Sequence, residues 1–265
     1  RQLYSTTDLA TLVMRMKENN PDRVIYLADA RQSMHFIQVF RCARKTGIVP
    51  DTTELVHIGF GTMNGKDGKP FKTRDGGVMR LEYLLKENQK EKENLNIDEA
   101  EAEQSAKTVA LAAVKYGDLS NQASKDYIFD IDRFTSFEGN TGPYILYTIV
   151  RIKSILSKYE AKGGDISALK DAIMPAVNAG QKNLMLSLAK FNATIESAYE
   201  ESAPHKICAY IYELANAFNG FYHDTKILSE ENEELKKSYI SLLVLTKEIL
   251  EACIDMLGFS APDRM

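Results

Sequence analysis

The spacing of apolar residues changes once along the chain. Near the start, two short and nearly continuous apolar runs, at 23–29 and 55–60, alternate with segments 6–20 and 33–46, in which apolar residues recur every three or four positions. Short continuous runs predict buried parallel strands, and the three-to-four spacing predicts helices. This order predicts a right-handed crossover in a parallel sheet, whose ligands lie beyond the carboxyl ends of the strands.

The remainder of the chain has helical spacing throughout. Segments 79–94 and 98–116 are predicted helices, and Pro143 suits the first position of a new helix after glycines and Asn140 break the chain. Everything after Gly164 is predicted to form a bundle of four or five antiparallel helices. In the helix at 205–228, the predicted buried stripe includes Phe218 and Tyr222. The predicted fold class is therefore α/β followed by all-α.

The first predicted helix begins after a run of polar residues. One of Thr6, Thr7 and Asp8 is expected to cap it. The alternative interpretation of Asp8 is an ordinary first-turn acid that interacts with the helix N–H groups.

Composition narrows the class of protein. The 265 residues are 44% hydrophobic and 26% charged, which is ordinary for a soluble globular protein, and no apolar run reaches the length of a membrane span. Three widely separated cysteines argue against a disulfide framework and a zinc site, so a reducing cytoplasm is expected. The chain starts at Arg1 without a signal segment, which favours a fragment.

Charge limits how the chain could bind a nucleic acid. The net charge is −4, and residues 139–265 hold 13 Lys and Arg against 16 Asp and Glu, a balance of −3. RNA contacts would therefore depend on local patches and base stacking. Tyr144, Tyr147 and Arg151 share one predicted helix face and could stack on bases, although such residues more often pack against a neighbouring helix.

A glycine-rich stretch at 56–81 carries four closely spaced cations, Lys66, Lys69, Lys72 and Arg74. Glycine backbone and lysine charge together suit a polyphosphate, whereas the alternative is a solvated hairpin-like loop. The spacing matches neither the G-x-G-x-x-G pattern nor a P-loop. Asp130 and Asp132 lack a third convergent ligand, so a structural role is favoured over a metal site.

Several phrases of the sequence resemble arginyl-tRNA synthetases, a class I aminoacyl-tRNA synthetase family. Lys69-Pro-Phe-Lys72-Thr-Arg74 resembles the form that the Lys-Met-Ser-Lys-Ser signature takes there, with Pro70 and Phe71 as departures from the general signature. The resemblance implies that Lys69 and Lys72 are catalytic and bind the ATP phosphates, as a cation clamp on the developing charge.

The resemblance also implies binding roles for other residues. Tyr4, Asp8 and Gln32 match the residues that bind the arginine substrate, and His35 with Gln38 continue the family phrase that begins at Asp29. The ATP-binding residues of the matching strand end are His57, Gly59, Phe60 and Gly61. The phrase at 216–223 and the ending at 261–265 resemble the anticodon-binding domain, which implies anticodon contacts for Tyr222 and Met265.

The resemblance covers nearly the whole chain and implies its organisation. Residues 1–97 would be the second half of a Rossmann-type catalytic domain, 98–138 a helical connector, and 139–265 an all-α anticodon-binding bundle. No His-Ile-Gly-His type element is present, so we expect a C-terminal fragment that is inactive alone.

The implied function is arginine–tRNA ligase activity through an arginyl-adenylate. ATP is the implied third substrate, beside tRNA and L-arginine. Mg²⁺ is implied by ATP chemistry, and no protein ligand is named for it. The protein is expected to be a monomer without membrane contact. The alternative is a non-catalytic tRNA-binding or helical interaction module.

Overall fold

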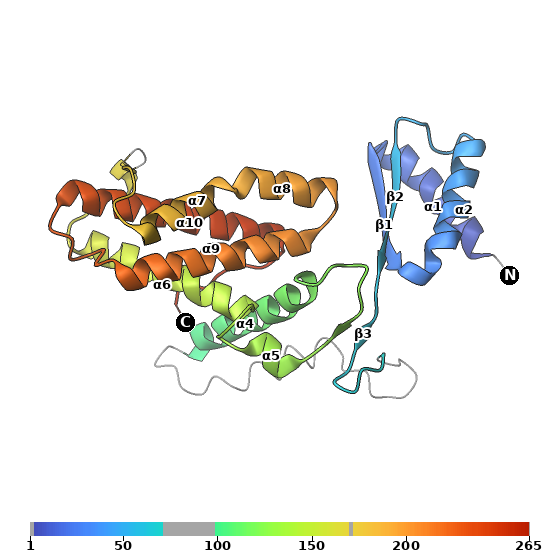
Figure 1. Cartoon of the computed structure of the whole chain (residues 1–265). Helices are drawn as coiled ribbons and strands as arrows, with labels where there is room; N and C mark the ends of the chain where they lie inside the picture. The colour runs from blue at the N-terminus through green and yellow to red at the C-terminus, as the bar shows by residue number, and fades with distance from the viewer. Residues whose placement is uncertain (1–2, 71–98, 170–171, 265) are drawn as a thin grey trace. The chain divides into compact units, whose positions relative to one another are not determined.

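A computed structural model describes residues 3–70, 99–169 and 172–264, which form two compact units (Figure 1). Unit 1 holds the described residues up to 70 together with 123–128, and unit 2 holds 99–122 and the described residues from 129 onward. The predicted helix at 79–94 lies outside the described residues. Among the described residues, no helix is long and apolar enough to cross a membrane.

Unit 1 confirms the predicted alternation of helices and strands. Its first elements are α1 (Tyr4–Asn19), β1 (Arg23–Asp29), the short 3-10 helix η1 (Ala30–Gln32), α2 (Ser33–Lys45) and β2 (Glu54–Phe60). β1 and β2 pair in parallel, in register from Arg23 opposite Glu54 to Asp29 opposite Phe60. The carboxyl ends of both strands therefore lie at one edge of the sheet.

A small core holds unit 1 together on one face of the sheet. Its buried members come from both helices, from β1 and from the turn after α2: Leu12, Val24, Val39, Ala43 and Val49. In β1 the alternate residues Ile25 and Leu27 are 47% and 67% exposed. Parallel sheets are normally covered on both faces, so the exposure of the apolar side chains Ile25 and Leu27 on the other face is unusual for a parallel strand.

The start of α1 differs from the prediction. The helix begins at Tyr4, with Leu3 as its N-cap and without a side-chain capping hydrogen bond. The Thr7 hydroxyl bonds back to the Leu3 carbonyl, so it does not cap the N–H groups. Asp8 lies in the second turn, which makes both proposed roles for it at the helix start wrong.

A second, two-stranded parallel sheet in unit 1 is absent from the prediction. β3 (Met63–Asn64) pairs with β4 (Tyr127–Ile128), and the Gly61 N–H donates to the Ala123 carbonyl at 2.9 Å. A backbone bridge between Asn64 and Pro70 closes a turn over 65–69. The described part of the glycine-rich stretch at 56–81 therefore ends in a hairpin-like turn.

Unit 2 is helical, as predicted. Its elements are α4 (Glu99–Leu119), α5 (Ile131–Thr135), α6 (Gly142–Ala161), the 3-10 helix η2 (Ser167–Leu169), α7 (Ala179–Ala189), α8 (Phe191–Glu200), α9 (Pro204–Asp224) and α10 (Glu233–Met256). Thr141, Asn178 and Asn232 cap α6, α7 and α10 through their side chains. Asp130 caps α5, which is a structural role, and no cluster of metal-binding side chains occurs among the described residues.

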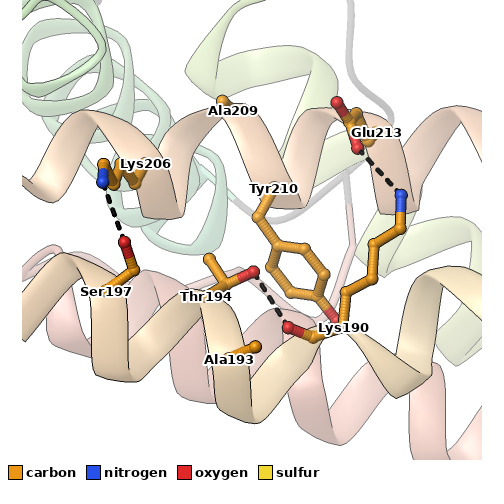
Figure 2. Close-up of a pocket in the computed structure, with 8 residues that line it drawn as sticks. All are labelled: Lys190, Ala193, Thr194, Ser197, Lys206, Ala209, Tyr210 and Glu213. Atoms are coloured by element: carbon orange, nitrogen blue, oxygen red, sulfur yellow. Dashed lines mark hydrogen bonds and ion pairs between the residues drawn. The ribbon is translucent and has the colours of Figure 1, made fainter.

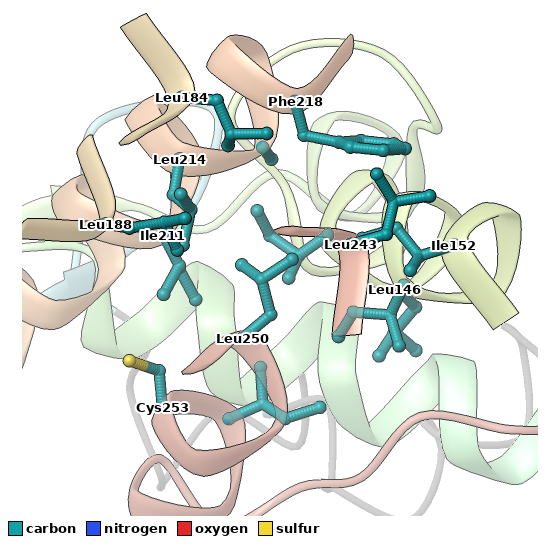
Figure 3. Close-up of a cluster of buried hydrophobic side chains, with 14 of the residues drawn as sticks. Leu146, Ile152, Leu184, Leu188, Ile211, Leu214, Phe218, Leu243, Leu250 and Cys253 are labelled. Carbon is teal, nitrogen blue, oxygen red and sulfur yellow. The ribbon is translucent and has the colours of Figure 1, made fainter. Parts of the chain in front are cut away.

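The core of unit 2 is built mainly from α6, α9 and α10 (Figure 3). Leu146, Phe218 and Leu250 are fully buried in it, and the buried thiol of Cys253 lies at its edge. All three cysteines are free. Burial in this core raises the pKa of the Cys208 and Cys253 thiols to about 12.

α4 belongs to the same compact unit as the bundle. The fully buried Tyr116 donates its hydroxyl to the Cys208 carbonyl of α9 at 2.8 Å, and the same hydroxyl lies 2.6 Å from the Asn140 side-chain oxygen. At Gly142 the start of α6 lies so close to α4 that a Cβ atom would be 2.3 Å from the Ala112 carbonyl oxygen. The boundaries 1–97, 98–138 and 139–265 stay predictions.

Candidate functional sites

The residues predicted to bind arginine lie on α1 and at the start of α2. Tyr4 and Asp8 are one turn apart on α1, which places them on the same helix face, and Gln32 is the residue that precedes α2. Tyr4 is 87% exposed and Gln32 is exposed. A hydrogen bond of 2.6 Å between Asp8 Oδ2 and His35 Nε2 joins the two helices here.

An aromatic cluster lies behind this hydrogen bond. The ring of His35 meets Phe36 edge-on at 5.2 Å, and Phe36 stacks on His57 of β2 at 4.7 Å. Tyr26 of β1 packs against Phe36 as well, and burial raises the pKa of its phenol, while Arg15 lowers it and Asp8 raises it. Asp8 is thus connected to His57 through the packed rings of His35 and Phe36.

Three further residues predicted to bind ATP, Gly59, Phe60 and Gly61, lie at the end of β2 and directly after it. Close backbone contacts require the two glycines. A Cβ at Gly59 would be 2.9 Å from the Ala30 Cα, and one at Gly61 would be 2.5 Å from the Lys125 carbonyl. Phe60 between them is exposed. The structure therefore gives both glycines a packing role, which does not test their predicted contact with ATP.

A charged cluster that the sequence analysis did not assign lies at the same edge. Arg31 bonds both carboxylate oxygens of Asp29, at 2.9 and 2.6 Å, and this pairing holds the pKa of Asp29 at about 2. The Thr62 N–H donates to Asp126 at 2.6 Å and lowers the pKa of that carboxyl. The position of Asp29 and Arg31 at the carboxyl end of a predicted strand was the sequence signal for this cluster.

Only part of the predicted phosphate-binding stretch can be placed. Lys69 is exposed at the end of the hairpin-like turn, where its N–H donates to Asp67 at 3.1 Å. Lys72 and Arg74 lie outside the described residues, as does Met265. The geometry of the two predicted catalytic lysines is therefore untested.

Unit 2 presents a polar and aromatic surface on α6 and α9. We call it the α6–α9 face, and its members are Tyr144, Tyr147, Arg151, Asn216, Asn219 and Tyr222. The Arg151 guanidinium lies 4.7 Å from the Tyr147 ring centre and 5.3 Å from that of Tyr222, and it donates to the Asn219 side-chain oxygen at 2.7 Å. Two rings and one amide therefore hold this cation in place.

The tyrosines of the α6–α9 face differ in hydrogen bonding and in exposure. The Tyr144 hydroxyl donates to Asn216 at 2.7 Å and accepts from Asn219 at 2.9 Å. Tyr147 and Tyr222 are 43% and 41% exposed. Tyr222 was predicted to lie in the buried stripe of its helix together with Phe218, which is wrong for Tyr222, because Phe218 and Phe221 occupy the fully buried positions.

The C-terminal segment is tied to unit 2 by two lysines. Lys115 of α4 donates to the Gly258 carbonyl at 2.6 Å, and Lys153 of α6 donates to Asp263 at 3.1 Å. Lys153 also lies 3.4 Å from Glu251 of α10. These contacts fix the segment that leads to Met265.

A groove of about 400 Å³ lies between α8 and α9 (Figure 2). Lys206 donates to Ser197 at 2.8 Å and pairs with Glu201, and Lys190 lies 3.8 Å from Glu213. These carboxylates balance the two cations, so the groove does not offer a net positive charge to a phosphate. We assign no function to it.

Two family profiles match the chain. The profile described as "tRNA synthetases class I (R), catalytic domain" matches residues 1–131, and the "DALR anticodon binding domain" profile matches residues 145–265. The first match contains the Asp8 and β2 residues, and the second contains the α6–α9 face except Tyr144.

Curated relatives agree with both profiles. The chain is 96% identical over 274 residues to the arginine–tRNA ligase of Agathobacter rectalis, and 55% identical over 268 residues to that of Alkaliphilus oremlandii. These alignments cover 99% of this chain but 46% and 45% of the two relatives. The chain therefore spans about half the length of the curated relatives it matches.

Solved structures resemble the chain over the same extent. Arginyl-tRNA synthetase from Plasmodium falciparum matches with a TM-score of 0.79 and 27% identity, over 99% of this chain and 44% of that one. The Thermus thermophilus arginyl-tRNA synthetase matches with a TM-score of 0.82 over 100% of this chain and 50% of its own. At 23% identity the second match supports the fold alone.

Proposed function

Because the chain belongs to the arginyl-tRNA synthetase family, we propose that it takes part in ATP-dependent attachment of L-arginine to its tRNA. The reaction would pass through an arginyl-adenylate with release of pyrophosphate. The observation that carries the proposal is 96% identity to an arginine–tRNA ligase over nearly the whole chain. Unit 1 would contribute half of the activation site, and unit 2 would read the anticodon.

In unit 1, we propose that Asp8 binds the guanidinium of arginine, with Tyr4 and Gln32 on either side of it. A carboxylate accepts the parallel N–H donors of a guanidinium in a bidentate pair. The placement of Tyr4 and Asp8 on one face of α1, opposite the start of α2, supports this assignment.

ATP would bind across the carboxyl ends of β1 and β2. His57, Gly59, Phe60 and Gly61 would contact the nucleoside, which agrees with the position of switch-point ligands beyond parallel strands. Lys69 and Lys72 would bind the phosphates. Mg²⁺ would be held chiefly by the phosphate oxygens, since no cluster of three metal-binding side chains occurs among the described residues.

In unit 2, the α6–α9 face would bind anticodon bases through stacking on the half-exposed rings of Tyr147 and Tyr222. Arg151 between the rings and the side-chain amide of the exposed Asn216 would offer hydrogen bonds to base edges, while Asn219 holds Arg151 and Tyr144 in place. Met265 is proposed to contact the anticodon as well. We further propose that the enzyme acts as a monomer in the cytoplasm.

Substitution of Asp8 in the full-length ligase tests the activation site. We expect Asp8→Asn to lower kcat/KM for arginine by about a hundredfold or more, because a partly buried guanidinium would lose its charged partner. The KM for ATP should change little. The measurement is arginine-dependent exchange of pyrophosphate into ATP, with Asp51→Asn, at an exposed turn of the same unit, as the matched control.

The same assay separates an enzyme from a non-catalytic binding module. Equal effects of Asp8→Asn on arginine and ATP would contradict the role of Asp8. Absence of both arginine-dependent exchange and arginine attachment to tRNA by the full-length protein would refute ligase activity altogether. The present chain alone should show no exchange, since catalysis needs preorganised groups from both halves of the site.

A further inference from the structure

The hydrogen bond between Asp8 and His35 connects residues that are 27 positions apart and lie on different helices. Its 2.6 Å length is short for a nitrogen donor and an ionised oxygen, and both side chains are about 70% buried, with exposed fractions of 28% and 31%. The edge of the His35 ring also packs on Phe36. His35 is therefore held from two sides.

We propose that His35 is a positioning residue for arginine recognition, which acts by fixing the carboxylate of Asp8. This inference rests on the proposed function, because it assumes that Asp8 binds the substrate guanidinium. His35 itself would not touch the substrate. Its effect would be to reduce the number of side-chain conformations that Asp8 must give up when arginine binds.

The chemistry of the pair determines the direction of the hydrogen bond. An ionised carboxylate only accepts, so His35 must carry its proton on Nε2 and donate it to Oδ2. A neutral imidazole with that tautomer leaves the negative charge of Asp8 intact for a guanidinium. Each carboxylate oxygen has two lone pairs, so Oδ2 can accept a second donor while Oδ1 stays available.

The location of His35 gives the contact a second consequence. His35 lies in the first turn of α2, three residues after Gln32, so its bond to Asp8 also sets the distance between the α1 and α2 residues proposed to bind arginine. Loss of the bond would therefore loosen the arginine subsite. His57 of β2 stacks on Phe36, which a substitution of His35 leaves in place, so the ATP residues should be affected much less.

The expected effect is specific to one substrate. In the full-length ligase, His35→Ala should raise the KM for arginine by about tenfold, by analogy with the loss seen when a hydrogen-bond partner that orients a metal ligand is removed. The KM for ATP and kcat should change by less than about twofold. His35→Gln should restore most of the arginine affinity, because its amide nitrogen can occupy the position of Nε2.

A double-mutant cycle distinguishes positioning from a general structural effect. The variants are His35→Ala, Asp8→Ala and the double variant, each assayed by pyrophosphate exchange with arginine and ATP varied separately. Arg41→Ala, at an exposed position on the same helix, is the matched control. If His35 acts through Asp8, its substitution should have no further effect on the arginine KM once Asp8 is absent.

Each outcome of this cycle has a separate meaning. If Asp8→Ala leaves the arginine KM unchanged, the proposed role of Asp8 fails and that of His35 fails with it. If Asp8→Ala raises the KM but His35→Ala does not, only the positioning role is overturned. A full tenfold effect of His35→Ala in the Asp8→Ala background would also overturn it.

A second pair of variants covers the case in which His35→Ala does not fold. His35→Gln and His35→Asn both keep a polar side chain, but the shorter asparagine cannot bring its nitrogen to the Nε2 position. The proposal expects a higher arginine KM for His35→Asn than for His35→Gln, at equal melting temperatures. Equal arginine KM values for the two variants would refute it.

Discussion

Arg151 and Tyr222 illustrate how a residue can be ordered before its ligand arrives. The guanidinium is already held by two rings and by Asn219, so little side-chain entropy would be lost when a base stacks beside it. Unit 2 carries a net negative charge over 139–265, so this local arrangement has to replace the general attraction that a basic surface would supply.

Removal of the Tyr222 ring is the direct test of this surface. We expect Tyr222→Ala to weaken binding of arginine tRNA by about 1–3 kcal/mol if a base stacks on the ring. The melting temperature should fall little, because the ring is 41% exposed. Tyr199→Ala on α8, which removes another exposed tyrosine ring, is the matched control.

The comparison uses two tRNAs, the cognate one and one with an altered anticodon. A Tyr222→Ala variant that melts early but binds both tRNAs like the parent would show that the ring serves the core and does not read the anticodon.

At the scale of elements, the close contact between α4 and α6 depends on Gly142. Alanine there would place a methyl group 2.3 Å from the Ala112 carbonyl oxygen, so the helices would have to move apart. We expect Gly142→Ala to destabilise the protein by about 1–3 kcal/mol, as overpacked sites do. Thermal and urea unfolding would measure it.

Gly220 on α9, in contrast to Gly142, has room for a larger side chain. It is exposed within a helix, and nothing lies within 4 Å of a Cβ built there. Gly220→Ala should therefore stabilise unit 2 by about 0.5–1 kcal/mol through helix propensity. Stabilisation by Gly142→Ala would contradict the close packing of α4 against α6, and destabilisation by Gly220→Ala would contradict the helix-propensity argument for α9.

The sequence predicted the elements better than the contacts between them. Runs such as 23–29 and the helical spacing after Gly164 depend on local burial, and β1, β2 and the helices of unit 2 occur where expected. The predicted start of α1 at Thr6–Asp8 was too late. The helix begins at Tyr4 with Leu3 as its N-cap, and the Thr7 hydroxyl donates to the Leu3 carbonyl and does not accept from an N–H group. Helix periodicity alone also did not distinguish half-exposed Tyr222 from buried Phe221.

Contacts over long sequence separations were beyond sequence reasoning. The Asp8–His35 bond and the β3–β4 pairing depend on how the chain folds back, and neither leaves a local pattern. The residues proposed to bind arginine were recognisable from resemblance, as was Tyr222, whereas Tyr144, Tyr147 and Arg151 were grouped by their spacing on one helix. Their mutual distances, such as the 4.7 Å between Arg151 and the Tyr147 ring, required the structure.

At the scale of the whole molecule, the two units should differ in stability. The sheet of β1 and β2 has two strands and leaves Ile25 and Leu27 exposed, whereas the helices of unit 2 surround an extensive core. Two-stranded sheets are marginal without further support. We expect amide hydrogens of β1 and β2 to exchange much faster than those of α6, α9 and α10 in this chain.

Hydrogen exchange followed by mass spectrometry would check this difference, with the full-length ligase as the reference. Protection of β1 should rise in the reference protein if further chain covers its exposed face. Equal protection of β1 and α9 in the present chain would contradict the expected difference between the units.

The Tyr116 hydroxyl has a practical consequence for any attempt to isolate the bundle by truncation. A piece that begins at residue 139 would lose the donor to the Cys208 carbonyl and the largest fully buried ring of the unit. It would expose to water the apolar surface on which α4 now packs, at a cost on the order of several kcal/mol. An expression clone of the bundle should therefore retain α4, and begin upstream of Glu99.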